Sequence, residues 1–345
     1  MARFMTWNIE WFTRLFDANG QLLADNQVDG DRPPQTRAQR FQAIADVLMA
    51  LDPAFVGLVE GPDSTNANPT RSVVAVLAFS NQFGLPYNAA TIGFRSDGQQ
   101  EIVAMWDPTR VQVRLNQGGG AGLSPAFDST FLVDTDDASV SEQFSFYRPP
   151  LELDVTDLSS GTSASVIVCH NKSKGIFNAT DLVHWERENR RSRRMLFGQA
   201  EWIRRRVDER LRQGNNVMVM VMGDFNDGVG QDWYETTLGK SSVETIIGDI
   251  FQPQDLLRHL PGRPQWNRSD GAWVPASTSF RDRITENWVR VLIDFLLISD
   301  GLQPDPGVVP PYFVWNPYSD PVPAAAINAQ LRNASDHFPV TVDLV

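Results

Sequence analysis

Long apolar segments alternate with amphipathic segments along most of this chain. The segment MVMVMGDFND, residues 218–227, is the clearest, because Val and Met follow one another without alternating polar residues until Gly223. Such a run predicts a strand that is covered on both faces and that leaves the core at Gly223. Asp224 and Asn226 follow at a spacing of two, so their side chains point the same way in an extended chain. We expect this carboxylate and this amide to face one ligand, such as a phosphoryl group and a water.

Other apolar segments predict further strands, and several of them end in a polar residue. The predicted strands cover residues 3–9, 54–59, 101–106, 111–115, 151–157, 163–169, 291–298 and 340–344. Apolar residues at helical spacing predict helices at 37–51, 72–83 and 185–212, the last as one long helix or a broken pair. The segments around Asp107-Pro108 predict a hairpin, and Asp294 interrupts the middle of the strand at 291–298.

Three segments carry weaker patterns. The stretch 128–142 holds acids and no basic residue, which predicts a surface insertion. Its acids are Asp128, Asp134, Asp136, Asp137 and Glu142. Residues 228–289 show little periodicity, and the seven prolines of 301–323 argue against regular structure there. Since no repeat or linker is evident, we expect a single domain over residues 1–345.

The composition is that of an ordinary globular protein of 345 residues with a net charge of −12. That charge argues against a protein that coats polyanions, but not against a nucleic-acid enzyme, because local basic patches and metal ions steer the substrate. Cys169 is the only cysteine, which excludes an intrachain disulfide and fits a reducing compartment. No signal peptide and no run of about 20 apolar residues is evident. We expect a cytoplasmic protein without membrane association or an obligate protein partner.

Basic residues concentrate in one predicted helix. Residues 187–212 hold ten arginines, four of which share a face at helical spacing. These four are Arg187, Arg190, Arg191 and Arg194. A solvated helix face is the simpler interpretation, and contact with a phosphate backbone is the alternative. The segment HNKSK, residues 170–174, follows another predicted strand, and its two lysines favour an anion beside His170.

Eight polar residues stand at the ends of predicted strands, in addition to Asp294. They are Asn8, Glu10, Glu60, His170, Asp224, Asn226, Asp336 and His337. Ligands of α/β proteins bind where strand ends meet at one edge of a sheet, so we expect these residues to share one pocket. Carboxylates without a cysteine cluster suit Mg²⁺ or Mn²⁺ together with a phosphate. The motifs of the common P-loop NTPases and serine hydrolases do not occur.

At these positions the chain resembles the endonuclease/exonuclease/phosphatase superfamily, which includes pancreatic-type deoxyribonuclease, the AP endonucleases and the neutral sphingomyelinases. Five motifs carry the resemblance in the family's order, from Thr6 to Val340. They are WNIE, GLVE, HNKSK, GDFND with the later LIDFLLIS, and SDHFP. The resemblance implies an α/β fold with two packed mixed β-sheets flanked by helices, a four-layer α/β/β/α sandwich.

The resemblance also implies roles for individual residues in the metal-assisted hydrolysis of a phosphate ester by in-line attack of water. The metal ligands would be Asn8, Glu10, Glu60 and Asp336, with Glu10 standing where many relatives have aspartate. The catalytic residues would be His170, Asp224, Asn226, Asp294 and His337. The substrate would be bound by Arg148, Lys172, Lys174, Arg187, Arg190, Arg191 and Arg194. Asp294 would orient His337, and both Asp224 and the His337–Asp294 pair are able to serve as the general base.

Three functions are compatible with the sequence. The favoured one is an Mg²⁺- or Mn²⁺-dependent endonuclease acting on DNA, with RNA as the other polymer, because HNKSK is similar to the H-x-K-S pattern of bacterial extracellular-type nucleases. The second is a phosphatase or phosphodiesterase acting on a small molecule or a lipid head group. The third is a binding module without catalysis, which the complete set of chemical positions disfavours. Arginines beside the pocket would favour a polymer, and the acidic stretch beside it would weigh against duplex DNA.

Overall fold

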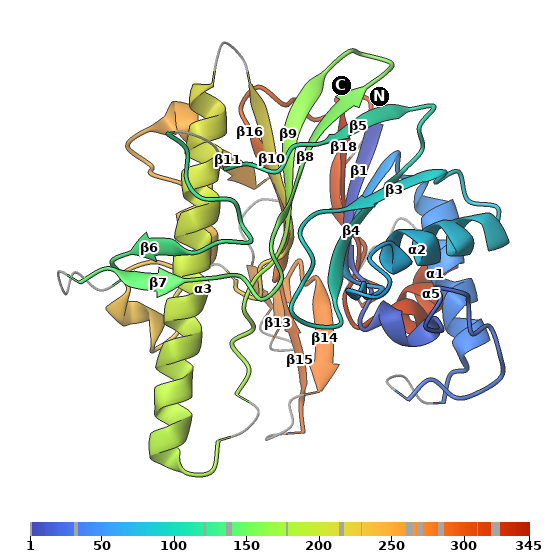
Figure 1. Ribbon diagram of the computed structural model, residues 1–345, viewed down its shortest axis with the longest axis horizontal. Helices are drawn as coiled ribbons and strands as arrows, with labels where there is room; N and C mark the ends of the chain where they lie inside the picture. Colours follow the sequence, from blue (N-terminus) through green and yellow to red (C-terminus); the bar gives the residue numbers. More distant parts are fainter. Residues whose placement is uncertain are drawn as a thin grey trace.

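The centre of the molecule consists of two six-stranded β-sheets (Figure 1). The computed structural model describes residues 2–30, 34–119, 122–135, 140–176, 179–213, 217–228, 230–259, 265–267, 272–281, 286–308, 310–318 and 325–345. The first sheet contains, in order, β17 (Tyr312–Val314), β18 (Val340–Leu344), β1 (Ala2–Asn8), β2 (Phe55–Gly61), β4 (Glu101–Trp106) and β3 (Ala89–Ile92). The second contains β11 (Leu257–His259), β16 (Asp294–Ser299), β10 (Met218–Asp224), β9 (Ser163–His170), β8 (Leu151–Asp157) and β5 (Val111–Leu115).

Helices cover the outer face of each sheet, so the expected α/β/β/α sandwich is confirmed. In Figure 1, α1 (Arg37–Leu51), α2 (Arg71–Gln82) and α5 (Asn328–Ala334) lie beside the first sheet, and α3 (Leu182–Arg212) lies beside the second. The long basic segment is therefore one continuous helix. The shorter helices are α4 (Ser242–Ile247) and the 3-10 turns η1 (Phe12–Leu15), η2 (Glu235–Thr237), η3 (Pro253–Asp255) and η4 (Ala325–Ile327).

The apolar strands are covered on both faces because each sheet lies between two packed layers. Along β1, Phe4 packs into the core between the sheets, whereas Met5 and Trp7 pack into the core under α1 and α2. The two sheets approach closely at Gly57, where an added Cβ would lie 3.0 Å from Met222 Sδ and 3.0 Å from Val168 Cγ1. A strand in this position needs apolar residues on both sides, which explains the continuous runs in the sequence.

Three predicted elements are wrong in their details. The segments 101–106 and 111–115 do not form a hairpin, because β4 pairs with β2 and β3 whereas β5 pairs with β8 in the other sheet. The predicted strand 291–298 is two strands, β15 (Trp288–Val291) and β16, and Asp294 begins the second instead of interrupting its middle. The proline-rich segment does contain regular structure, since β17 pairs with β18.

The segments with weak patterns form small additions to the sandwich. β6 (Phe131–Val133) and β7 (Glu142–Phe144) pair beside α3, where the ring of Phe131 stacks on that of Trp202 with centroids 5.3 Å apart. Asp136 and Asp137 lie outside the described residues. Beyond β10, β12 (Gln265–Asn267) pairs with β13 (Ala272–Val274), and β14 (Thr278–Arg281) pairs with β15. Within the described ranges, no helix combines the length and the apolar character needed to cross a membrane.

Candidate active site

The ends of four central strands meet at one edge of the sandwich. Asn8 ends β1 and Glu60 lies near the end of β2, and these two strands run parallel. His170 ends β9 and Asp224 ends β10, which are also parallel and place the two residues opposite each other in register. Since parallel neighbours end at the same edge, the fold brings these polar residues together as the sequence predicted.

Hydrogen bonds join the two sheets at this edge. The Asn8 side-chain amide donates to Asp224 Oδ2 at 3.0 Å and to Glu60 Oε1 at 3.4 Å. Glu60 Oε2 accepts from the Trp11 amide at 2.9 Å. His170 Nε2 lies 3.6 Å from Asp224 Oδ2 and 3.9 Å from Glu60 Oε1. Two carboxylates from different sheets therefore share one polar cluster with an amide and an imidazole.

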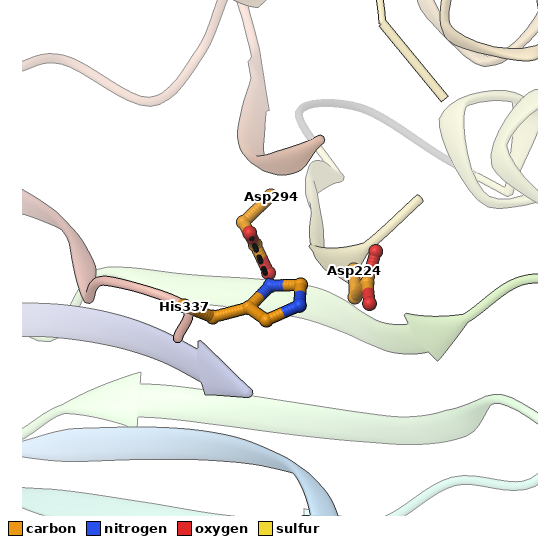
Figure 2. A group of neighbouring side chains, drawn as sticks. All are labelled: Asp224, Asp294 and His337. Carbon is orange, nitrogen blue, oxygen red and sulfur yellow. Dashed lines mark hydrogen bonds and ion pairs between the residues drawn. The ribbon is translucent and has the colours of Figure 1, made fainter. Parts of the chain in front are cut away.

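His337 adds a second imidazole to this cluster. Figure 2 shows its ring between the carboxylates of Asp294 and Asp224. Nδ1 lies 2.8 Å from Asp294 Oδ2, and that oxygen also accepts a hydrogen bond of 2.7 Å from the Ser277 hydroxyl. The backbone amide of Asp294 donates to Ser277 Oγ at 2.9 Å, so Ser277 bonds both the carboxylate and the backbone of Asp294. The expected orientation of His337 by Asp294 agrees with this geometry.

A cavity of about 790 Å³ opens beside these groups. Its chemical lining comprises Glu60, Asp97, His170, Asp224, Asn226 and His337, with Arg148 and Lys172 as the cationic residues and Trp11, Phe146 and Tyr147 as the aromatic ones. Arg148 donates to Gln100 Oε1 and to the Asn171 carbonyl, the latter at 3.3 Å. The arrangement combines anion-binding groups with proton-transfer groups in one cavity of ligand size.

The charges in the cavity perturb each other. Burial, and then the charge of Asp294, raise the pKa of Asp224 to about 7. Burial opposes the charged form of His337, but Asp294, by its charge and hydrogen bond, raises the pKa of His337 well above its usual value. Burial lowers the pKa of His170 well below its usual value, and Arg148 lowers it further. Such opposed shifts in neighbouring groups are typical of acid–base sites.

Left-handed backbone conformations cluster at the same edge. Glu10, Trp11, Glu60 and Asn226 all have φ between 48° and 58°, which non-glycine residues seldom adopt. Three of them follow or end a central strand, and the Asn226 amide is held by Asp224 Oδ1 at 2.8 Å. The chain thus departs abruptly from the strand direction where the polar side chains are needed, and backbone strain of this kind gathers at functional sites.

Not all of the predicted metal ligands lie in the main cavity. Glu60 does, and Asn8 spans Glu60 and Asp224. Glu10 and Asp336 instead line a neighbouring cavity of about 300 Å³. Among the described residues, Asp224, Asp294 and His337 form a group of three whose ligand atoms all lie within 4.8 Å of one another.

These residues fit a hard divalent cation. The available donors are carboxylate oxygens, and Asp294 Oδ1 and Asp336 Oδ1 are buried without a hydrogen-bond partner in the described part of the chain. Burial of a carboxylate is costly unless a hydrogen bond or a positive charge compensates it, and a bound cation would supply that charge. Because Asp294 Oδ2 already bonds His337 and Ser277, the free acceptor capacity lies with Asp294 Oδ1, Glu60 and Asp336.

The predicted substrate-binding residues separate into two groups. Arg148 and Lys172 line the cavity, and the charge of Arg191 acts on Lys172. Lys174 is not among the lining residues, because its ammonium contacts Asp227 and Glu235. Along α3, Arg187, Arg190 and Arg191 are exposed, and Arg194 pairs with Glu142 at 3.1 Å. None of these four arginines is among the residues that line the cavity, and Arg191 acts on the lining only through its charge beside Lys172.

Several residues that hold the site were not predicted from the sequence. Ser277 and Gln100 lie in segments without a chemical motif, and their roles depend on contacts with Asp294 and Arg148. Asn171 stands inside the HNKSK motif, and its carbonyl accepts from Arg148 and from the Asn226 amide group at 3.0 Å. Its position between His170 and Lys172 was the one available signal.

Solved structures share this fold at low sequence identity. An endonuclease/exonuclease/phosphatase family protein from Bacteroides thetaiotaomicron is 14% identical with a TM-score of 0.52, covering 99% of this chain and 94% of its own. A mannosyl-6-phosphatase from the same organism is 11% identical with a TM-score of 0.51, covering 100% of both chains. Humanized D. rerio TDP2 is 13% identical with a TM-score of 0.49, covering 100% of this chain and 98% of its own.

Sequence comparisons identify the family. A search of curated proteins found no match. A family profile described as Endonuclease/Exonuclease/phosphatase family matches residues 5–337, which include every motif from WNIE to SDH. The chain belongs to the Endonuclease/Exonuclease/phosphatase family.

Proposed function

We propose that the protein is a divalent-metal-dependent phosphodiester hydrolase whose substrate is DNA. Family membership suggests a hydrolase of phosphoester bonds, and the cavity supplies the observation that carries the proposal. In it, two imidazoles, three carboxylates and two cationic side chains converge on one space. The cationic groups suit a phosphoryl anion, and the carboxylates and imidazoles suit a metal ion and proton transfer from water.

The residues of the cavity have different proposed roles. Arg148 and Lys172 bind the phosphoryl oxygens of the substrate, and Asn226 orients these oxygens. His170 is neutral because of its lowered pKa, so it contributes a hydrogen bond and no charge. His337 keeps its proton beside Asp294 and offsets negative charge on the substrate. Asp224 is placed to accept the proton of the attacking water directly. The His337–Asp294 pair can accept it only where His337 has first lost its own proton, and either group can be the general base.

A metal ion would be held first by Glu60, which Asn8 would orient through its amide. Asp336 and Glu10 line the neighbouring cavity and would complete the ligand set from that side. When bound, Mg²⁺ or Mn²⁺ neutralises charge on the phosphoryl oxygens. The donor chemistry favours these ions over zinc, because the proposed ligands are carboxylate oxygens and the chain has a single cysteine, Cys169.

The choice of DNA rests on Arg191 and on the course of α3. The helix lines the cavity through Met195 and Gln199, and Arg191 lies one turn further along the same face. Its guanidinium is 71% exposed and can follow a backbone beyond the phosphate in the cavity. RNA offers the same phosphates, so the two polymers differ in the proposal only by preference.

A small phosphate ester is the second candidate. Ion pairs occupy part of the basic face, since Arg191 lies 3.8 Å from Glu188 and Arg194 lies 3.1 Å from Glu142. The mannosyl-6-phosphatase shares the fold at a TM-score of 0.51, which shows a likeness of fold alone. A substrate confined to the cavity would not need the arginines of α3.

Nicking of supercoiled plasmid with Mg²⁺ or Mn²⁺ tests the proposal. We expect nicking by the wild type, none with EDTA, and none by His170→Ala. Arg191→Ala should weaken plasmid binding and lower the slope of log affinity against log salt concentration by about one, the value for one lost phosphate contact. Arg205→Ala, further along the same helix, should change neither quantity. An intact plasmid with either metal would contradict the DNA assignment. Equal behaviour of both arginine variants would favour a small substrate.

A further inference from the structure

Two loops carry most of the predicted catalytic residues, and both continue directly from parallel strands. Residues 170–174 follow β9, and residues 224–228 follow β10. Near the strands the loops are joined by the backbone. The Asn171 amide donates to the Asp224 carbonyl at 3.0 Å, and the Asn226 side chain donates to the Asn171 carbonyl at 3.0 Å. The far ends of the two loops are joined by Lys174 and Asp227.

The ammonium of Lys174 is enclosed by acids. It contacts Asp227 Oδ1 and Glu235 Oε1 and lies 3.8 Å from Asp232 Oδ2. The side chains of Asp227 and Glu235 are 1% and 4% exposed. Burial lowers the pKa of Lys174, but Asp227 and Glu235 together raise it above the usual value, so the charge is retained. A lysine in such surroundings has no free donor directed at the cavity, which it does not line.

Asp227 is held equally firmly on its other side. Its Oδ2 accepts hydrogen bonds of 2.7 Å from both the amide and the hydroxyl of Ser242, at the beginning of α4. Its Oδ1 accepts from the Gly228 amide at 2.9 Å in addition to Lys174. Every acceptor direction of this buried carboxylate is therefore used, and it connects the loop after β10 to α4.

The backbone of Lys174 is fixed from α3 as well. Arg193 Nη1 donates to the Lys174 carbonyl at 3.1 Å. The same guanidinium binds Asp232 Oδ2 through Nε at 3.0 Å and Nη2 at 2.8 Å. Asp232 Oδ1 in turn accepts from the Glu235 amide at 2.9 Å. Two cations and three acids thus form one partly buried network, in which Asp227 and Glu235 are the most enclosed members.

We infer that Lys174 is a positioning residue, and that its pair with Asp227 holds the loops of His170 and Asp224 in register. Asp227 follows Asn226, whose left-handed backbone (φ 52°) needs support from its surroundings. Lys174 lies two residues beyond Lys172, which lines the cavity. If the pair is broken, both loops lose their common anchor, and the distances around Asp224 change. This inference rests on the proposed hydrolase function of the same site.

The test compares Lys174→Met, Lys174→Arg and Asp227→Asn with the wild-type protein, using hydrolysis of bis(4-nitrophenyl) phosphate with Mn²⁺. A misplaced catalytic group lowers the rate constant about 10²-fold for a shift near 1 Å. We expect kcat to fall about 10- to 100-fold in Lys174→Met and Asp227→Asn with KM nearly unchanged, and Lys174→Arg to recover much of it. Lys172→Met should instead raise KM, because Lys172 faces the substrate.

Lys240→Met is the matched control. Lys240 also pairs with an acid, Glu201 at 2.9 Å, but it does not line the cavity. Its loss should leave both kinetic constants unchanged. Hydrogen exchange supplies a readout without substrate or metal, since the anchor predicts faster exchange of the amides in residues 170–174 and 224–228 in Lys174→Met. Should Lys174→Met fail to fold, Asp227→Asn and Lys174→Arg carry both measurements.

The outcomes separate the two claims. A wild type without activity on any phosphate ester contradicts the proposed function, while the exchange experiment still decides whether the anchor exists. An active wild type with a higher KM and unchanged kcat in Lys174→Met overturns the positioning role and makes Lys174 a substrate contact. Unchanged kinetics and unchanged exchange in both Lys174→Met and Asp227→Asn also overturn it.

Discussion

Asp294→Asn isolates the charge of the acid that orients His337. The substitution keeps the shape of the side chain, and an amide oxygen can still accept from His337 Nδ1, which lies 2.8 Å from Asp294 Oδ2. A hydrogen bond to a charged group contributes about 1.5–3 kcal/mol, and a factor of ten in rate corresponds to about 1.4 kcal/mol. We therefore expect kcat to fall about 10- to 100-fold.

The same substitution should lower stability moderately. Oxygens of Asp224 and Asp294 lie within 4.8 Å of each other, and repulsion at that distance is about 3 kcal/mol at an effective dielectric constant of about 20. By the same formula, the attraction between His337 and Asp294 at 2.8 Å is about 6 kcal/mol, so relief of the repulsion offsets about half of its loss. We expect the free energy of unfolding without metal to fall by about 3 kcal/mol.

Steady-state hydrolysis of bis(4-nitrophenyl) phosphate and urea unfolding measure the two quantities. Ser277→Ala is the control, because it removes a neutral hydrogen bond to the same oxygen and should lower kcat by less than about tenfold. Wild-type kcat in a folded Asp294→Asn protein would refute the role of the pair. A kcat that falls only in proportion to lost stability would show that Asp294 is structural.

Three further predictions concern the fold and its response to pH. Arg40 is fully buried and pairs with Asp29 at 2.6 Å. Arg40→Met should therefore lower the free energy of unfolding, measured by urea titration, by about 3 kcal/mol or more, and a loss below about 1 kcal/mol would contradict this. Gly223 has φ 134°, and an added Cβ would lie 1.9 Å from the Cys169 carbonyl oxygen. Gly223→Ala should therefore lower the free energy of unfolding by at least about 3 kcal/mol, and a near-native melting temperature would count against the close approach. Burial lowers the pKa of His259 to about 4 from 6.5, so the unfolded state binds a proton at a higher pH than the folded state does. The free energy of unfolding should therefore be constant above pH 6.5 and fall by about 2–3 kcal/mol as the pH drops to 4. His259→Phe should remove that component of the pH dependence, and identical pH profiles for both proteins would disprove it.

The sequence predicts the edge of the sandwich well because strand ends carry their own signal. The apolar run before Asp224 and the polar residues after it depend on burial along one strand, which is a local property. The same holds for α1, where Thr36 and Gln39 form a capping box at the predicted beginning. Where an element depends on contacts within one segment of the chain, the sequence pattern and the structure agree.

The errors concern partners that are distant in the chain. Residues 101–115 have the pattern of two strands joined by a turn, which predicts a hairpin. The two strands instead pair with β2 and β8 in different sheets, and a local pattern does not reveal such distant partners. The charge of Lys174 is visible in the sequence, yet its acidic partners Asp227 and Glu235 follow more than fifty residues later. Ser277 lies in a segment without periodicity, so its contact with Asp294 could not be inferred.

The most direct test of the central claim is the rate of bis(4-nitrophenyl) phosphate hydrolysis by the wild type and by Asp224→Ala, each with Mn²⁺ and with EDTA. Asp224 is buried, contacts Asn8 and faces His170 in the cavity. The account predicts hydrolysis by the wild type with Mn²⁺ alone and a loss of at least about 10²-fold in the folded variant. Equal rates for the two proteins, or a rate that EDTA does not change, would contradict a metal-dependent phosphodiester hydrolase at this site.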